Sequence, residues 1–293
     1  MVASDRFIKA LLCLVILLIV RRPDAQADES FKVEHSVVIP IESKILGRRY
    51  EAYVKIPPSY DSPENQHRHY PVLYMTDGAY TFQVASGVTM VPFNHNRLKE
   101  FILVGISNAV NEDPGIARSR DLTPWSVQKY THQTGGAANY LEFIKTELVP
   151  IVENRFRIDP GQRVLTGQSY GGLFGLWVAF KDPDLFQSYI LTSPSIWYAR
   201  RSILTSEADS FRTHRDLKAK IYLTAGQMEV PGECGSCTVN MIADAKNLAE
   251  RLRSRRYPGL EVRYEESRGT DHETTFPVGL LKGLQWLFPG AGE

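Results

Sequence analysis

Arg163-Val164-Leu165-Thr166-Gly167-Gln168-Ser169-Tyr170-Gly171-Gly172-Leu173-Phe174-Gly175-Leu176-Trp177 is the stretch that decides the fold. An apolar, β-prone run leads into Gly167, Ser169 follows two residues later, and paired glycines open an apolar run that suits a helix. A G-x-S-x-G pattern between a strand and a helix is typical of a nucleophile elbow, in which the serine takes a strained backbone conformation and its hydroxyl stands above the sheet edge. A Cβ atom at Gly167 or Gly171 would collide with the neighbouring strand or helix. We therefore predict that Ser169 is a nucleophile, the alternative being a glycine-rich turn with an incidental serine.

Strands and helices alternate on both sides of this elbow. Short, continuously apolar runs at 70–75 and 101–107 are typical of central strands that are covered on both faces. Two runs with a period of two, at 33–39 and 49–56, predict an antiparallel hairpin at a sheet edge. The pattern predicts an α/β fold with a mostly parallel central sheet and an antiparallel N-terminal edge hairpin. Further strands are expected at 188–193, 220–225 and 260–266, with helices at 135–156, after Ser169, around 241–252 and at 276–288.

Two polar residues at the ends of later strands can activate Ser169. In hydrolases with this elbow, the serine is followed along the chain by an acid and then by a histidine, each on a loop after a strand. Glu229 follows one predicted strand, and His272 directly follows the last predicted strand and precedes the closing helix. We expect His272 to take the proton of Ser169 and Glu229 to orient the imidazole. Asp271 and Glu233 are alternative acids, although neighbouring side chains on an extended segment point apart, which disfavours Asp271.

A second part of the site is expected after the strand at 70–75, where the chain reads Thr76-Asp77-Gly78-Ala79-Tyr80. In α/β-hydrolases the loop at this place supplies one backbone N–H of the oxyanion hole, and the residue after the nucleophile supplies the other. We therefore expect the N–H groups of Ala79 and Tyr170 to stabilise the negative charge that develops on the substrate oxygen. The Asp-Gly pair is equally compatible with an ordinary turn.

The stretch from 108 to 134 is predicted to be a long irregular loop, and loops of that length in compact domains are usually functional. It carries Arg118, Arg120 and Trp125, which suit an anionic or aromatic ligand. Trp197 and Tyr198 follow the strand at 188–193, on the sheet edge where open α/β sheets bind ligands. We expect these five side chains to bind substrate, the alternative being a solvated loop with surface arginines.

The first 27 residues have the features of a secretory signal peptide. Arg6 and Lys9 precede an apolar run from Ala10 to Val20, and Ala25-Gln26-Ala27 is compatible with a signal-peptidase site. The apolar run is short for a bilayer core of roughly 30 Å. We predict cleavage after Ala27 and a periplasmic or secreted protein with no stable membrane span in its mature form. The basic pair Arg21-Arg22 after the apolar run leaves an uncleaved membrane anchor as the alternative.

Removal of this segment also removes Cys13 and leaves two cysteines, Cys234 and Cys237. In an oxidising compartment their C-x-x-C spacing predicts a small structural disulfide. A thioredoxin-like redox pair is the alternative. Zinc binding would need two more ligands, and no matching cluster is present in the sequence, so no metal site is expected.

The composition points to one catalytic domain over residues 28–293. The chain has 293 residues, of which 43% are hydrophobic, and α/β proteins of this size commonly form one domain. The formal net charge is +1 and the basic residues are spread along the chain, which gives no reason to expect a nucleic-acid partner.

Five segments of the chain, ordered along nearly the whole predicted mature part, match a known pattern. They are Tyr74-Met75-Thr76-Asp77-Gly78, Arg120-Asp121-Leu122-Thr123-Pro124, Gly167-Gln168-Ser169-Tyr170-Gly171-Gly172, Ser193-Pro194-Ser195-Ile196-Trp197 and Gly269-Thr270-Asp271-His272. With them the chain resembles the esterase D, or putative esterase, family of α/β-hydrolases. Within that family it is most similar to the periplasmic esterases that hydrolyse catecholate siderophore trilactones such as enterobactin and salmochelin. The resemblance implies a secreted serine esterase without a cofactor, acting on such trilactones in ferric or iron-free form.

The chain departs from the family pattern at Gln168, where family elbows usually carry histidine. Some siderophore esterases are thought to work with serine and histidine alone, so the resemblance supports Ser169 and His272 more firmly than Glu229. Related members act on short acyl, feruloyl, glutathione thioester and mycolyl substrates, which leaves the natural ester open.

Three other functions remain compatible with the sequence. An acyltransferase would use the same residues and exclude water from the acyl-enzyme. A non-catalytic binding protein on this scaffold usually lacks a member of the triad, and none is missing here. A thiol-disulfide oxidoreductase would depend on Cys234 and Cys237 instead.

Overall fold

A computed structural model describes residues 31–214, 216–233 and 238–291 of the chain. The chain divides into two units, residues 1–32 and 33–293, and the second contains the sheet and the helices of the fold. The predicted signal peptide at 1–27 and the predicted disulfide between Cys234 and Cys237 both lie outside the described residues.

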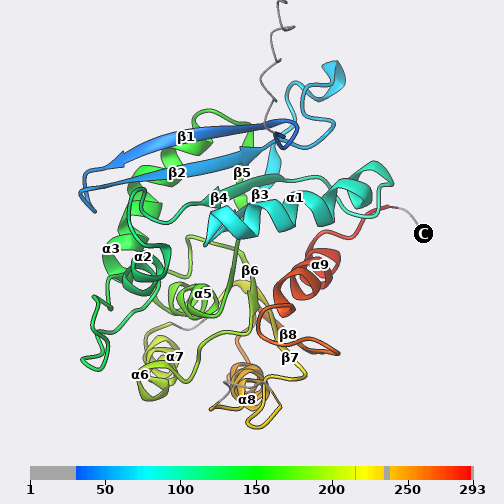
Figure 1. The fold of residues 1–293 in the computed structure, drawn as a ribbon. Helices are drawn as coiled ribbons and strands as arrows, with labels where there is room; N and C mark the ends of the chain where they lie inside the picture. The colour runs from blue at the N-terminus through cyan, green and yellow to red at the C-terminus, as the bar shows by residue number, and fades with distance from the viewer. Residues whose placement is uncertain (1–30, 215, 234–237, 292–293) are drawn as a thin grey trace, which may run out of the picture. The chain divides into compact units, whose positions relative to one another are not determined.

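The second unit is built on an eight-stranded sheet (Figure 1). The strand order is β1-β2-β4-β3-β5-β6-β7-β8, and the pairs from β4 to β8 are parallel, whereas β1, β2 and β4 pair antiparallel. This confirms the predicted mostly parallel sheet with an antiparallel N-terminal edge hairpin. The strands are β1 Ser36–Ser43, β2 Arg48–Lys55, β3 Tyr70–Met75, β4 Ile102–Ile106, β5 Ile158–Gln168, β6 Ser188–Thr192, β7 Ala219–Gly226 and β8 Leu260–Ser267.

Helices cover both faces of the sheet (Figure 1). Helices α1 and α9 pack on one face, around Met75, Phe101 and Leu280, and α5 and α8 pack on the other, around Phe174 and Leu248. The helices of the unit are α1 Gly78–Asn94, α2 Pro114–Asp121, α3 Ala137–Phe143, the π-helical turn Ile144–Leu148, α4 Val149–Glu153, α5 Tyr170–Lys181, α6 Tyr198–Arg201, α7 Ile203–Thr213, α8 Met241–Ser254 and α9 Thr275–Leu287, with a 3-10 turn at Pro63–Asn65.

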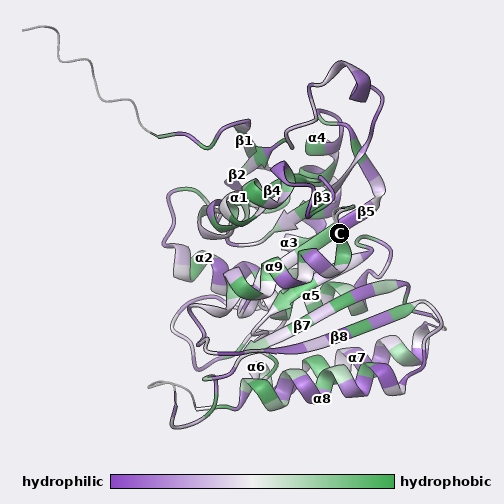
Figure 2. Ribbon diagram, turned by 90° about the vertical axis from the view of Figure 1, so that its right-hand side faces the viewer, coloured by the Kyte–Doolittle hydropathy of each residue, from purple (hydrophilic) through white to green (hydrophobic). Residues whose placement is uncertain are grey.

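The burial of each element follows its sequence pattern. Strand β4 is buried at every position, and all of α5 from Gly171 to Phe180 is buried, as expected of elements covered on both sides. Helix α8 lies at the surface and carries both hydrophobic and hydrophilic residues (Figure 2). Among the described residues, no helix combines the length and the apolar character that a membrane crossing needs.

The prediction of a wholly irregular stretch at 108–134 is wrong, because this stretch contains α2. Asp113 caps the helix by accepting a hydrogen bond from the Ile116 backbone N–H at 2.9 Å, and Pro114 takes the first helical position. An Asp-Pro pair of this kind is an ordinary helix start. The correction matters for the site, because a helix gives Arg118 and Arg120 different surroundings.

The strand register brings the candidate site residues to one edge of the sheet. Met75 at the end of β3 pairs with Thr166, and Gln168 at the end of β5 pairs with Thr192. Thr192 in turn pairs with Thr224. The chain segments that follow β3, β5, β6, β7 and β8 therefore all leave the sheet at its carboxyl edge.

Candidate functional site

Ser169 lies between β5 and α5 with a backbone φ of 59° and ψ of −115°. Residues other than glycine rarely adopt such a positive φ. Neighbouring backbone groups hold Ser169 in this conformation. The Ser169 N–H donates to the Thr192 carbonyl at 3.1 Å, and its own carbonyl accepts from the Leu173 N–H at 2.9 Å. A Cβ at Gly167 would lie 2.6 Å from the carbonyl carbon of Gly171, and one at Gly171 would overlap the Thr76 side chain. The predicted steric need for these two glycines is confirmed.

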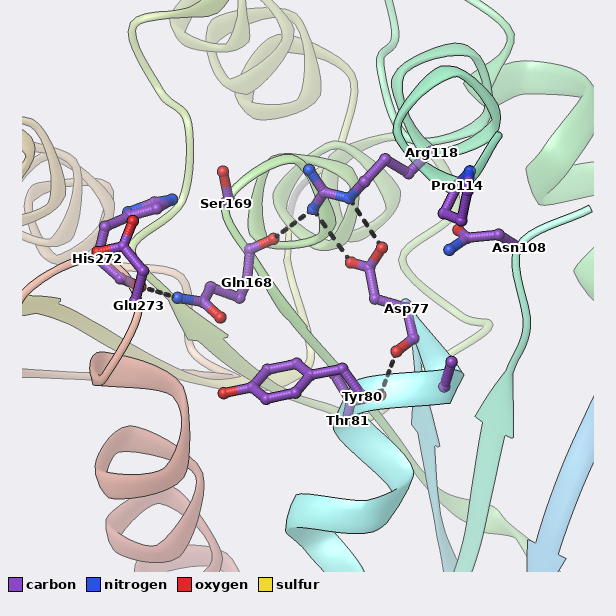
Figure 3. Close-up of a pocket in the computed structure, with 11 residues that line it drawn as sticks. Asp77, Tyr80, Thr81, Asn108, Pro114, Arg118, Gln168, Ser169, His272 and Glu273 are labelled. Atoms are coloured by element: carbon purple, nitrogen blue, oxygen red, sulfur yellow. Dashed lines mark hydrogen bonds and ion pairs between the residues drawn. The ribbon is translucent and has the colours of Figure 1, made fainter. Parts of the chain in front are cut away.

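The Ser169 hydroxyl contacts a second serine. Its Oγ lies 3.2 Å from the Oγ of Ser195, which is 1% exposed and whose backbone N–H donates to the Ser169 carbonyl at 3.0 Å. Figure 3 draws no hydrogen bond between Ser169 and the His272 imidazole. Catalytic hydrogen bonds are often long without substrate and shorten when it binds. In this structure the hydrogen-bond partner of the Ser169 hydroxyl is Ser195.

Glu229 and His272 are brought together at the ends of β7 and β8. The His272 Nδ1 lies 2.8 Å from Oε2 of Glu229, whose side chain is fully buried. The other oxygen, Oε1, accepts from the Gly226 N–H at 2.7 Å and from the Ser193 hydroxyl at 2.5 Å. Burial on its own raises the pKa of Glu229, but the hydrogen bonds from His272, Ser193 and Gly226 outweigh it and leave the pKa below its ordinary value. Glu229 is therefore an anion at neutral pH.

The two alternative acids have other surroundings. The Oδ1 of Asp271 accepts hydrogen bonds from the backbone N–H of Thr274 at 3.0 Å and from its hydroxyl at 2.5 Å, just before α9 begins. Glu233 is exposed in the segment after β7. Within the described part of the chain, the carboxylate that hydrogen-bonds to His272 is that of Glu229.

Two helices begin beside Ser169. Helix α5 starts at Tyr170 and α1 starts at Gly78, so that the N–H groups of Tyr170 and Ala79 lie in first turns, where no intrahelical acceptor exists. The N–H groups of Tyr80 and Thr81 donate to the Asp77 carbonyl at 3.0 and 3.1 Å, whereas Ala79 lines the same pocket as Ser169. The role of the Tyr170 and Ala79 N–H groups as oxyanion-hole donors stays a prediction.

A pocket with a volume of about 560 Å³ opens beside Ser169 (Figure 3). It joins residues that follow β3, β4, β5 and β8. Its lining consists of Asp77, Ala79, Tyr80, Thr81, Asn108, Pro114, Arg118, Gln168, Ser169, His272 and Glu273.

Arg118 lines this pocket, and its guanidinium is already paired. Nε and Nη2 donate to the two carboxylate oxygens of Asp77 at 2.9 and 3.2 Å, and Nη2 lies 3.5 Å from the Gln168 carbonyl oxygen. The Arg118 Cζ also lies 5.5 Å from the centre of the Tyr170 ring. The charge of Arg118 is thus offset by Asp77 within the pocket.

Arg120 does not line the pocket. Its side chain is 6% exposed and donates to Asp121 Oδ1 at 2.8 Å and Oδ2 at 3.1 Å, and to Glu112. Tyr50 of β2 donates to the same Asp121 carboxylate at 2.8 Å. Residues two apart on a helix point to nearly opposite sides, so Arg118 faces the pocket and Arg120 faces the interior. This position does not support the prediction that Arg120 contacts substrate, and we assign it a structural role.

The rings of Trp197 and Tyr198 pack next to the Tyr170 ring, and Trp125 contacts Tyr198 through its backbone carbonyl. None of these three predicted aromatic residues lines the pocket beside Ser169. The ring centres of Trp197 and Tyr198 lie 6.4 and 5.4 Å from that of Tyr170. Tyr198 is 1% exposed and its hydroxyl donates to the Trp125 carbonyl at 2.9 Å. Tyr130, which is carried by the same stretch as Arg118, Arg120 and Trp125, also joins them, because its hydroxyl lies 3.1 Å from that of Tyr170. We call Tyr130, Tyr170, Trp197 and Tyr198 the aromatic cluster.

Gln168 has a further contact that the sequence does not predict. Its side-chain amide donates to the backbone carbonyl of His272 and so ties the loop after β8 to the elbow. Tyr80, Asn108 and Glu273 are likewise pocket residues that were not predicted to act in the site. They come from three different segments, and no local pattern marks them.

Residues 43–287 of the chain match the model of the family described as "Putative esterase". Ferri-bacillibactin esterase BesA of Bacillus subtilis is 27% identical to this chain, over 90% of this chain and 93% of that protein. Apo-salmochelin esterase of Escherichia coli O6:H1 is 27% identical over 58% of this chain and 54% of its own length. The solved structure of the BES protein from Bacillus cereus superposes with a TM-score of 0.76 and 29% identity, covering 89% of this chain and 97% of that one.

Proposed function

Because the chain belongs to the putative esterase family and is a carboxylic-ester hydrolase, we propose that it cleaves siderophore esters with Ser169 as nucleophile, His272 as base and Glu229 as the acid that orients His272. The observation that carries the proposal is the 2.8 Å hydrogen bond between His272 and the fully buried Glu229, at the sheet edge where Ser169 occupies the elbow.

The proposed reaction has two halves. His272 removes the proton of the Ser169 hydroxyl while its Oγ attacks the ester carbonyl carbon, and the N–H groups of Ala79 and Tyr170 stabilise the oxyanion. His272 then gives the proton to the leaving alkoxide, which departs as an alcohol and leaves an acyl-enzyme. In the second half His272 takes a proton from water while the water oxygen attacks the acyl carbonyl carbon. His272 then returns this proton to the Ser169 Oγ as the acyl bond breaks, which releases the carboxylic acid and restores the free hydroxyl. Glu229 stabilises the imidazolium in both halves.

The substrate class is supported by two observations. The similar proteins from Bacillus subtilis and Escherichia coli are esterases of bacillibactin and salmochelin, and both names refer to siderophores. The aromatic cluster next to the elbow offers ring faces that suit the catechol groups of such a substrate. We propose that the partly exposed Trp125 and Trp197 act there, whereas Tyr198 is buried, which does not support its predicted contact with substrate. We also propose that Arg118 fixes the position of Asp77 at the entrance to α1.

Ser169→Ala tests the nucleophile. The variant should lose about 10⁶-fold in turnover of an iron-free catecholate trilactone and of p-nitrophenyl acetate, by comparison with the loss of a nucleophilic serine in subtilisin. A fluorophosphonate should label the wild type on Ser169 and leave the variant unlabelled, as read by peptide mass spectrometry. Ser254→Ala, in the exposed last turn of α8, is the control and should keep full activity. Retention of a tenth of the activity by Ser169→Ala would assign the nucleophile elsewhere.

Export is a further part of the proposal. We propose that residues 1–27 are removed and that Cys234 and Cys237 are oxidised to each other in the mature protein. The intact mass of the native exported protein, before and after thiol alkylation, tests both points. A mass that includes Met1, or two alkylated thiols without prior reduction, would contradict them.

A further inference from the structure

The pocket beside Ser169 offers an anionic ligand fewer unpaired arginine side chains than the sequence of residues 108–134 predicts. Arg118 is the arginine among its lining residues, and both carboxylate oxygens of Asp77 accept hydrogen bonds from it. The pair is neutral as a unit. Arg120, the other arginine expected to hold an anionic ligand, is buried against Asp121 and Glu112 outside the pocket.

Glu273 adds a negative charge that is not offset. It lines the pocket beside His272, and Figure 3 shows it on the side opposite to Arg118. Its side chain is exposed, and none of the described residues forms an ion pair with it. The nearest arginine along the chain, Arg268, is exposed and is not among the pocket-lining residues. With His272 neutral, the lining therefore carries one uncompensated negative charge.

The two forms of a catecholate siderophore differ strongly in charge. Phenolic hydroxyls titrate near pH 10, so the iron-free catechols are essentially neutral at pH 7. In the ferric complex the phenolate charges outnumber those of Fe(III), and the complex is a multiply charged anion. A carboxylate on the pocket wall repels such an anion and leaves the neutral form unaffected.

We propose that this enzyme selects the iron-free ester over its ferric complex, and that Glu273 sets the preference. The inference rests on the proposed siderophore function. One relative is named for a ferric siderophore and the other for an iron-free one. The names therefore do not indicate which form this chain prefers, and the preference is inferred from the charges of its own pocket. The chemical class of the preferred ligand is a neutral ester with uncharged catechol rings.

The test compares kcat/KM of the full-length protein for an iron-free catecholate trilactone and for its ferric complex. The wild type should prefer the iron-free form by about tenfold, an order of magnitude set by the repulsion between like charges at a partly solvated site. The preference should shrink as the ionic strength is raised above about 0.1 M, because salt screens charges about 10 Å apart.

Glu273→Gln should reduce the preference about threefold, and Glu273→Lys should remove or reverse it. Both substrates use the same Ser169 and His272, so an indirect effect of Glu273 on the neighbouring His272 changes both rates and cancels in the ratio. Glu250→Gln is the matched control, because it removes the same charge from an exposed position on α8 and should leave the ratio unchanged.

A second pair of substrates separates charge from the bulk of the ferric complex. p-Nitrophenyl butyrate and the p-nitrophenyl monoester of succinate are similar in length, and the second carries a carboxylate. The wild type should prefer the neutral ester, and Glu273→Lys should lose that preference. If neither trilactone form is hydrolysed, the proposed function falls and this inference falls with it. If both are hydrolysed and the ferric complex is equal or better, the siderophore function stands and only the selection by Glu273 is overturned.

Discussion

Glu229 is the residue whose surroundings most constrain its chemistry. Its carboxylate accepts hydrogen bonds from His272, Ser193 and the Gly226 N–H, and the Oγ1 of Thr275 lies 3.1 Å from Oε1. An amide at this position would turn its NH₂ group toward at least one of these donors. The neighbouring Asp271 instead accepts hydrogen bonds from Thr274 at the start of α9. The two carboxylates are therefore expected to differ sharply in their importance for activity.

Glu229→Gln should lower kcat by 10²-fold to about 10⁴-fold, because His272 loses the group that fixes its tautomer and stabilises its charged form. Asp271→Asn should stay within about twofold of the wild type, since it changes only exposed hydrogen bonds from Thr274. Steady-state kinetics with p-nitrophenyl acetate measure both. If Glu229→Gln keeps the kcat of the wild type and Asp271→Asn loses most of it, the acid is Asp271 and our assignment is wrong.

The lowered pKa of Glu229 also predicts how stability depends on pH. The native state holds the Glu229 proton less tightly than the unfolded chain, whose glutamate pKa is about 4.3. The unfolded state therefore binds more protons in acid, and the contribution of Glu229 to stability is complete above that pH and is lost as the pH falls through the native pKa. Urea unfolding of the wild type and Glu229→Gln should show a stability difference that narrows below pH 4. A difference that widens in acid would contradict this sign.

At the level of elements, α2 separates two roles that the sequence places side by side. Arg118 faces the pocket, whereas Arg120 joins α2 to Tyr50 of β2 through Asp121. Arg48, also on β2, donates to the same Glu112 that accepts from Arg120. This group of charges therefore connects the edge hairpin to the segment that carries one wall of the pocket.

Arg120→Ala should destabilise the fold by about 3 kcal/mol, because it leaves the buried Asp121 carboxylate without its cation. Activity toward a catecholate ester and toward p-nitrophenyl acetate should fall together, through loss of folded protein. Urea unfolding followed by fluorescence gives the free energy of unfolding. Arg49→Ala, which removes exposed ion pairs on β2, is the control and should change stability by less than about 1 kcal/mol. If Arg120→Ala lowers activity toward the catecholate ester only, Arg120 binds substrate and the structural assignment is wrong.

The same helix shows where prediction from sequence ends. Hydrophobic periodicity and glycine spacing are enough to predict β3, the elbow and the closing helix, because the conformation of each of these segments is determined by residues within the segment. The sides occupied by Arg118 and Arg120 depend on whether residues 114–121 are helical. The sequence signals this helix through its Asp113-Pro114 start, and no long apolar periodicity supports that signal. Contacts such as Gln168 with the His272 carbonyl, or Ser169 with Ser195, join segments far apart in the chain and leave no local signal.

Across the whole sheet, strand order explains how the two halves of the site meet. Strand β3 lies between β4 and β5, although β4 follows β3 in the chain, so Asp77 and Ala79 after β3 stand next to Ser169 after β5. Strands β6, β7 and β8 then extend the sheet in chain order, which brings Glu229 and His272 to the other side of Ser169. The sequence predicts the alternation of strands and helices, but the position of β3 depends on pairing between strands distant in sequence.

The backbone of Ser169 has a consequence for the history and engineering of such a protein. A serine held at φ 59° and ψ −115° destabilises the fold by about 1–3 kcal/mol, and glycine adopts this conformation without strain. A selection for heat resistance alone would therefore favour glycine at position 169 and yield a sturdier, inactive protein. If Ser169 is the nucleophile as proposed, this residue persists as serine only while catalysis is selected, and stability and activity are in conflict at one position of the chain.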